Sequence, residues 1–146
     1  MAEELKNDER LMAMFSHLSI FFGAIILPVI FWAINKDKSR FAAFHAMQAL
    51  FFHIAYFAII VAWILIMVFG GVGLGLITAG SHAFQHNSGP PTFFIIVLLV
   101  FYAFLFIIIF FFIGFSIYVA VKSYRGEYTK YPIIGNIVYK KFYSQP

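Results

Sequence analysis

The run FAAFHAMQALFFHIAYFAIIVAWILIMVF, residues 41–69, opens a stretch of 81 residues, ending at Val121, that contains no Asp, Glu, Lys or Arg. A helix that crosses a bilayer needs about 20 apolar residues, so this stretch is long enough for two crossings and must turn between them. Glycines, small polar residues and the pair Pro90-Pro91 interrupt it from Gly70 onward, and such residues are typical of turns. The stretch therefore predicts membrane-spanning helices over residues 41–69 and 92–121.

The composition agrees with a membrane protein. Of the 146 residues, 63% are hydrophobic and only 11% are charged, whereas soluble domains average about 45–50% apolar and about 25% charged residues. This composition excludes a soluble enzyme and a disordered tail, and the absence of Cys excludes a disulfide-stapled secreted module.

A further charge-free run supplies a third crossing. Residues 11–34 have the length of one span, and Pro28 within them predicts a kink because proline lacks a backbone donor. We therefore expect an all-α integral membrane protein, a single membrane domain over residues 1–146 with three transmembrane helices. A short amphipathic helix over residues 2–16 would lead into the first span, and the tail, 122–146, would include an interfacial helix after Pro132.

The positions of Lys and Arg predict the orientation, because basic residues favour the cytoplasmic side. With three spans, the loop around Lys38 and the C-terminal tail share eight of the ten basic residues, and Lys6 and Arg10 lie opposite. The start is acidic and no signal-peptide cleavage site follows. We expect a multi-pass protein of the cell inner membrane, with its N-terminus outside and its C-terminus in the cytoplasm.

The tail combines tyrosines with basic residues, a pattern that predicts an interfacial belt in contact with anionic lipids or with a partner. A membrane-facing end without a specific partner explains the same pattern equally well. The candidate interface residues are Tyr124, Arg125, Tyr128, Tyr131, Lys140 and Lys141.

Polar residues inside the spans are the best candidates for a site, because burying them in hydrocarbon is costly. They include His17, His45, Gln48 and His53. His45 and Gln48 lie one turn apart and should both face another helix. The four side chains form either a path for a polar solute or proton, or interhelical hydrogen bonds that fix packing. The second interpretation is the more economical.

No cofactor, metal or nucleic acid is expected. His82 and His86 have the spacing of a metal pair on a helix, but they lie among turn residues and without a third ligand. His17 and His53, the one pair that could hold a haem, would lie at different depths in three spans. The glycines at 70–75 match no nucleotide-binding loop. Because the spans contain no carboxylate and no lysine, we expect no enzymatic activity.

Several motifs resemble a known family. His17-Leu18-Ser19 enters the first span, Phe44-His45-Ala46-Met47-Gln48-Ala49-Leu50 opens the second, and Gly126-Glu127-Tyr128 with Tyr131-Pro132 follows the last. In order and spacing they resemble the Tic-twenty-like family of small membrane proteins, a domain of unknown function named after a chloroplast inner-envelope protein-import subunit. The resemblance implies three or four spans and no established enzymatic activity. His45, Gln48 and Leu50 would match its central motif, and Tyr131 and Pro132 its closing one.

These observations favour a non-enzymatic inner-membrane subunit that serves as an accessory or scaffold of a larger complex, including one for protein translocation or assembly. Its expected partners are the lipid bilayer, other integral membrane proteins and further copies of itself. The alternative is a small oligomeric pore or carrier, with a path lined by His45, Gln48 and His53. Residues 70–83 could form either a re-entrant segment or an exposed loop.

Overall fold

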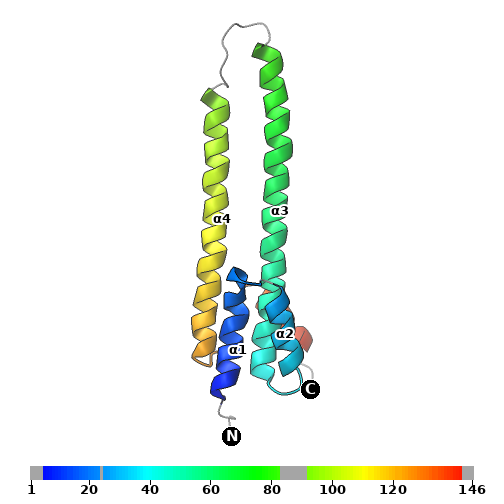
Figure 1. The fold of residues 1–146 in the computed structure, drawn as a ribbon, viewed down its shortest axis with the longest axis vertical. Helices are drawn as coiled ribbons and strands as arrows, with labels where there is room; N and C mark the ends of the chain where they lie inside the picture. Colours follow the sequence, from blue (N-terminus) through cyan, green and yellow to red (C-terminus); the bar gives the residue numbers. More distant parts are fainter. Residues whose placement is uncertain (1–4, 24, 83–91, 143–146) are drawn as a thin grey trace. The chain divides into compact units, whose positions relative to one another are not determined.

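The computed structural model describes residues 5–23, 25–82 and 92–142, and these form helices and turns without a strand. The chain divides into two compact units, one of residues 1–56 and 112–146 and one of residues 57–111. The expected all-helical fold is confirmed, and Figure 1 labels its main helices. Their bounds are α1 Asn7–Leu18, η1 Ser19–Phe21, α2 Ile26–Asn35, α3 Arg40–His82, α4 Thr92–Tyr124 and α5 Ile134–Phe142.

Two helices, α3 and α4, are long and apolar enough to cross a membrane. They contain the spans predicted over residues 41–69 and 92–121. The predicted break at Gly70 is wrong, because α3 continues to His82 through the glycines at 70–75. Glycine favours turns in water, but in an apolar environment a helix keeps every backbone group hydrogen-bonded, and this outweighs the low helix propensity of glycine.

The segment 11–34 is not one spanning helix, contrary to the prediction. Helix α1 ends at Leu18, a single 3₁₀ turn follows, and α2 is only ten residues long. The Ser16 and Ser19 hydroxyls donate to the carbonyls of Met12 and Ser16, both at 2.7 Å, and such bonds compete with the backbone pattern of a helix. The segment is therefore a pair of short helices.

Pro28 does not kink a helix. It lies in the first turn of α2, which begins at Ile26, and there its missing N–H would have no helical partner in any case. The chain reverses direction between α1 and α2 (Figure 1), and the Asn35 side chain at the end of α2 donates to Met12 Sδ of α1 at 3.0 Å. The two helices form an antiparallel hairpin.

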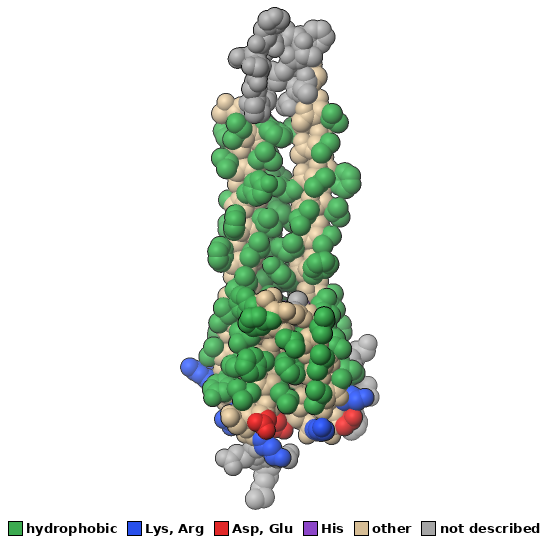
Figure 2. All heavy atoms as spheres, viewed as in Figure 1, with side chains coloured by type: hydrophobic (Ala, Val, Ile, Leu, Met, Phe, Trp, Pro, Cys, Tyr) green, Lys and Arg blue, Asp and Glu red, His purple; other side chains and the backbone are tan. Residues whose placement is uncertain are grey.

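This hairpin brings both of its ends to the same end of the first unit. Leu5 and Glu9, at the start of α1, line one pocket together with residues 36–41 and with Tyr128 of the tail. Charged side chains gather at this end (Figure 2). A crossing over 11–34 would have placed Leu5 and Lys38 on opposite sides of the membrane.

The segment after α4 is held by a glycine cap. Gly126, with φ of +84°, takes the left-handed conformation. Its N–H donates to the Ser123 carbonyl at 2.9 Å, and the Glu127 N–H donates to the Lys122 carbonyl at 3.1 Å, which is the bonding pattern of a Schellman motif. The chain then turns back towards α3 and continues into α5.

Helix α5 packs on the start of α3. Val138 is buried with Phe44 and Met47, and Trp32 of α2 packs against the same cluster. A second cluster contains Tyr131 with two residues from α3 and α4, Phe52 and Val119. The two clusters thus join α2, α3, α4 and α5 with the segment between α4 and α5. In the second unit, Trp63 of α3 lies 5.3 Å from Phe101 and 4.9 Å from Phe104 of α4, measured between ring centroids.

Candidate functional site

A buried polar network lies in the first unit and joins α1 to α3. The His17 Nε2 atom lies 3.0 Å from His45 Nδ1, and neither side chain is accessible to solvent. The two rings meet edge to face, with centroids 5.2 Å apart. Two sequence-predicted residues from separate helices are therefore direct partners.

Tyr131 of the tail extends the network. Its hydroxyl lies 3.0 Å from His17 Nδ1, so both nitrogens of His17 have a partner. On the other side, His45 Nε2 lies 3.1 Å from the backbone carbonyl of Glu127. The Tyr131 hydroxyl, the two imidazole rings and the Glu127 carbonyl thus form one continuous chain of hydrogen bonds.

The Glu127 carbonyl at the end of this series of hydrogen bonds determines which nitrogen of each histidine carries a hydrogen. A carbonyl oxygen only accepts, so His45 Nε2 must carry a hydrogen, and in a neutral ring His45 Nδ1 is then an acceptor. His17 Nε2 donates to it, which leaves His17 Nδ1 to accept from the Tyr131 hydroxyl. With both histidines neutral, every member has a partner of the correct kind.

Two serines of α4 support the histidines. Ser116 Oγ donates to the backbone carbonyl of His17 at 2.7 Å. Ser123 Oγ donates to the Val119 carbonyl at 2.7 Å and lies 3.1 Å from His45 Nδ1, so it is an alternative donor to that nitrogen. Sequence reasoning missed this role of the serines. Their seven-residue spacing, which places them on one face of α4, is the signal that could have found it.

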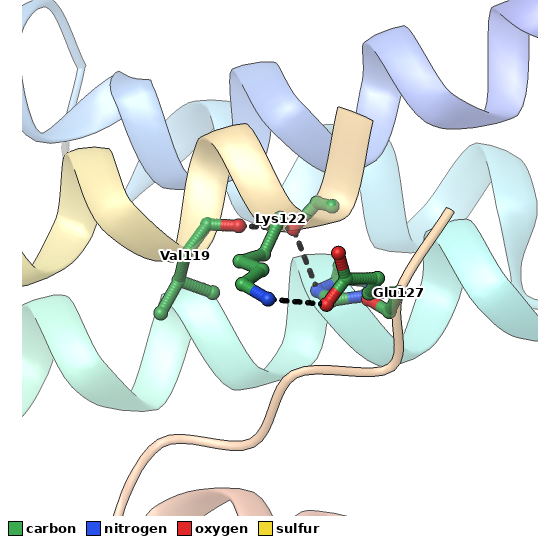
Figure 3. A network of polar contacts seen from close by, with 5 residues as sticks. Val119, Lys122 and Glu127 are labelled. Atoms are coloured by element: carbon green, nitrogen blue, oxygen red, sulfur yellow. Dashed lines mark hydrogen bonds and ion pairs between the residues drawn. The ribbon is translucent and has the colours of Figure 1, made fainter. Parts of the chain in front are cut away.

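The cap after α4 presents the Glu127 carbonyl to His45. The backbone bonds of the Schellman motif hold Glu127 at the helix end, and its carboxylate forms an ion pair with Lys122 at 2.7 Å (Figure 3). The motif Gly126-Glu127-Tyr128 therefore has a structural explanation: glycine provides the turn, and the next residue supplies the acceptor.

Gln48 binds the same tail one turn further along α3. Its Nε2 donates to the Thr129 carbonyl at 3.0 Å, and its Oε1 accepts from the Tyr131 backbone N–H at 3.2 Å. We expected His45 and Gln48 to face another helix. His45 does contact α1, but both side chains also bind the backbone of the segment between α4 and α5.

Aromatic rings enclose the network. The Tyr131 ring stacks on Phe52 with centroids 3.9 Å apart and an angle of 2° between the planes. Phe41 and Phe44 lie edge to face with His45, at 4.6 and 5.2 Å. Tyr128 also stacks on His45 at 6.1 Å. Such an apolar wall excludes water and makes an unpaired polar group costly.

Close packing at Gly135 completes the site. A Cβ atom at this position would lie 2.5 Å from Gln48 Oε1 and 2.8 Å from the backbone Cα of Lys130. The backbone of α5 therefore approaches the Gln48 side chain at a distance that leaves room for a hydrogen atom only.

The remaining predicted residues have different surroundings. His53 is buried beside Phe52. Tyr124, Arg125, Tyr128 and Lys140 are exposed, as an interface requires, whereas Tyr131 is only 1% exposed and belongs to the core. The side chain of Lys141 lies outside the described part of the chain. Burial raises the pKa of Tyr131 above its usual range, and partial burial, with a smaller effect of Tyr139, raises that of Tyr128.

The network is arranged to hold elements together. His17 uses both ring nitrogens within the chain, so binding a haem with His53 would first require breaking its bonds to Tyr131 and His45. The described residues contain no group of three or more His, Cys, Asp or Glu side chains placed to bind a metal. Of the candidate metal pair, the His82 side chain and all of His86 lie outside the described residues.

Residues 8–138 match the magnetosome magnetite crystal formation protein family, MamF/MmsF, and the chain belongs to this family. No curated protein and no solved structure matches the chain. The resemblance to the Tic-twenty-like family is wrong, because the motifs on which it rested lie within the range that matches MamF/MmsF. A part in protein translocation loses its support with it. The family and the two apolar helices together indicate a membrane protein.

Proposed function

We propose that this member of the MamF/MmsF family is a non-enzymatic helical protein of the magnetosome membrane that takes part in magnetite crystal formation. The observation that carries the proposal is the family match, which spans residues 8–138 and therefore includes both long apolar helices and the buried network. The magnetosome membrane replaces the general inner membrane as the expected location.

The geometry of the network supports a structural role over a catalytic one. Its imidazole, phenol and amide groups bind one another or the backbone, and these bonds connect α1, α3, α4 and the tail. A catalytic group must be accessible to its substrate, whereas His17 and His45 are fully buried among aromatic rings and helices. We infer that the site holds the first unit in one conformation.

The same observations disfavour the pore. Polar side chains within the membrane mark the paths of ions, protons and polar solutes. In residues 57–77 of α3 and 93–111 of α4, the only side chains with a polar atom that can form a hydrogen bond belong to Trp63 and Tyr102, apart from the weakly polar sulfur of Met67. Residues 57–77 and 93–111 therefore contain no comparable series of polar side chains.

We further propose a topology of two spans, α3 and α4, with the α1–α2 hairpin embedded from one side only. All ten Lys and Arg residues lie outside the stretch 41–121. With the hairpin returning to its starting side, all ten fall on one side, which the positive-inside rule assigns to the cytoplasm. The N-terminus then shares that side with the C-terminus, in place of the opposite sides expected from three spans.

Association with other membrane proteins or with a second copy would occur through the apolar faces of α3 and α4. Their side chains are extensively exposed in the described chain, including Phe69, Leu76, Phe106 and Phe110. The exposed residues Ile133, Ile137 and Tyr139 of the tail would lie in the interface beside Lys140.

Gene deletion in a magnetite-forming host tests the function. We expect fewer or smaller crystals by electron microscopy, restored by a plasmid copy of the chain, with an epitope tag to confirm membrane levels. An unchanged distribution of crystal number and size in the deletion strain would refute the proposal.

Cysteine labelling tests the topology separately, because the native chain has no Cys. We expect Lys6→Cys and Lys38→Cys to react with a membrane-impermeant maleimide from the same side, and Thr92→Cys from the opposite side. Labelling of positions 6 and 38 from opposite sides would restore a crossing over residues 11–34.

A further inference from the structure

A pocket of about 720 Å³ opens at the charged end of the first unit, within the size range of small-molecule sites. It is formed by the start of α1, the α2–α3 connection and the tail after α4. No member of the His17–His45–Tyr131 chain lines it. The pocket is therefore separate from the buried network, although Tyr128 borders both.

The rim of the pocket carries charges of both signs. Lys36, Lys38 and Arg40 supply three cations, and Glu9 and Asp37 supply two carboxylates. Tyr128, which also lines the pocket, has a pKa raised chiefly by partial burial and by Tyr139; Glu9 raises this pKa further and Arg40 lowers it, so charges of both signs act on the phenol. A ligand in this pocket meets an anion-binding and a cation-binding group at once.

The floor is aromatic and fixed in position. Phe41 is 1% exposed, and its ring meets Tyr128 edge to face with centroids 5.0 Å apart. Ser39 Oγ accepts from the Ala42 N–H at 3.2 Å and so holds the start of α3. Aromatic faces attract ammonium groups, and Leu5 adds an apolar wall.

We propose that this pocket binds a phosphoethanolamine group, the zwitterionic headgroup of a membrane phospholipid. Arg40, with Lys36 and Lys38, binds the phosphate, because guanidinium groups form paired hydrogen bonds with phosphate oxygens. Glu9 and Asp37 bind the ammonium beside the Tyr128 ring. Acyl chains would leave along the Leu5 wall towards the apolar surface of the hairpin.

The two carboxylates distinguish this ligand from an anionic one. A phosphatidylglycerol headgroup offers its phosphate to the same three cations, but it has no ammonium to pair with Glu9 and Asp37, and these carboxylates repel its negative charge. A free phosphate has the same disadvantage. The pocket thus differs from the basic tail, where the one carboxylate among residues 122–142, that of Glu127, is paired with Lys122.

Native mass spectrometry of the full chain in mild detergent tests the site with phosphatidylethanolamine and phosphatidylglycerol as probes. We expect preferential retention of phosphatidylethanolamine. Arg40→Gln should weaken this binding roughly tenfold, the effect of losing one charge-assisted bond. Glu9→Gln should reduce the preference over phosphatidylglycerol.

Matched controls remove the same charges outside the pocket. Arg125→Gln and Asp8→Asn should leave the retention of phosphatidylethanolamine unchanged, since neither residue lines the pocket. Lys38→Gln, an exposed change, is the second test if Arg40→Gln lowers the yield of folded protein.

Competition with soluble O-phosphoethanolamine distinguishes a free ligand from a lipid. Displacement at millimolar concentration would show that the headgroup alone suffices, and no displacement would show that the acyl chains contribute; both agree with the proposed chemistry. Equal retention of the two lipids by the unmodified chain, or equal losses in the pocket and control variants, would overturn the site.

Discussion

His17 Nε2 and His45 Nδ1 lie 3.0 Å apart in the core of the first unit, although 28 residues separate them in the sequence. This bond fixes the end of α1 against the first turns of α3, and it exists only because the segment between them folds back as a hairpin. The position of α1 and the pairing of the two imidazoles therefore depend on each other.

Removing the hydroxyl of Tyr131 should destabilise the protein. Tyr131→Phe keeps the ring stacked on Phe52 but leaves His17 Nδ1 without its donor. A buried group that loses its partner costs about 1–3 kcal/mol. We expect a lower midpoint in thermal unfolding of the purified protein in detergent. Tyr124→Phe, at an exposed tyrosine, is the control and should leave the midpoint unchanged. Equal midpoints for both variants would show that the hydroxyl contributes nothing.

Gln48 should protect the tail from proteolysis. It binds the backbone on both sides of Lys130, through the Thr129 carbonyl and the Tyr131 N–H. Gln48→Leu keeps an apolar side chain in the core but leaves these two backbone groups unpaired. Trypsin should then cleave after Lys130 several-fold faster than in the unmodified protein. Phe51→Leu, an exposed change on the same helix, should not affect this rate. Unchanged cleavage in Gln48→Leu would mean that other contacts hold the tail.

Much of the fold could be predicted from the sequence where a single physical requirement decides it. Residues 41–121 contain no charged side chain, so the long apolar helices α3 and α4 must lie in lipid or in a protein core. Length and composition do not decide the fold of residues 11–34, because a helical hairpin and a single spanning helix can have the same length and composition. The difference depends on local bonds of Ser16 and Ser19 and on the packing of α1 against α3, which composition does not describe.

The sequence predicts which residues belong to the site, but not which groups they bind. His17, His45 and Gln48 were selected because burying them is costly, and all three are buried. His17 and His45 bind each other, and their further partners and those of Gln48 are a tyrosine and backbone groups of the tail. No residue pattern specifies a backbone partner. Tyr131 was assigned to the membrane interface because it lies near basic residues. The turn at Gly126 and the bonds of Tyr131 to Gln48 and His17 place it in the core.

Gly135 should tolerate no side chain. A methyl group there would lie 2.5 Å from Gln48 Oε1 and 2.6 Å from Lys130 Cβ, and the nearby Lys130 Cα cannot move freely. Overpacking of this kind costs about 1–3 kcal/mol, so Gly135→Ala should lower the unfolding midpoint and displace α5. Gly114→Ala in α4 is the control, because no atom lies within 4 Å of its Cβ position. There the alanine should raise helix stability slightly. A midpoint for Gly135→Ala equal to that of the control would contradict the packing described.

The stability of the protein should fall at alkaline pH because of Tyr131. Burial raises the pKa of its phenol in the folded state above the ordinary value of about 10. Its contribution to stability is therefore complete below pH 10, where the phenol is neutral in both states. It decreases as the pH rises from 10 towards the folded-state pKa, because the unfolded chain loses the proton first.

Unfolding midpoints measured between pH 8 and pH 11.5 test this expectation. The midpoint of the unmodified protein should decline above pH 10, and the decline should be shallower in Tyr131→Phe, which has no phenol to ionise at this position. Tyr128 remains in both proteins, and its raised pKa adds the same smaller decline to each. Tyr124→Phe should keep the full decline, because this variant retains the buried Tyr131 phenol. Parallel curves for the unmodified protein and Tyr131→Phe would show that the buried phenol does not couple folding to pH.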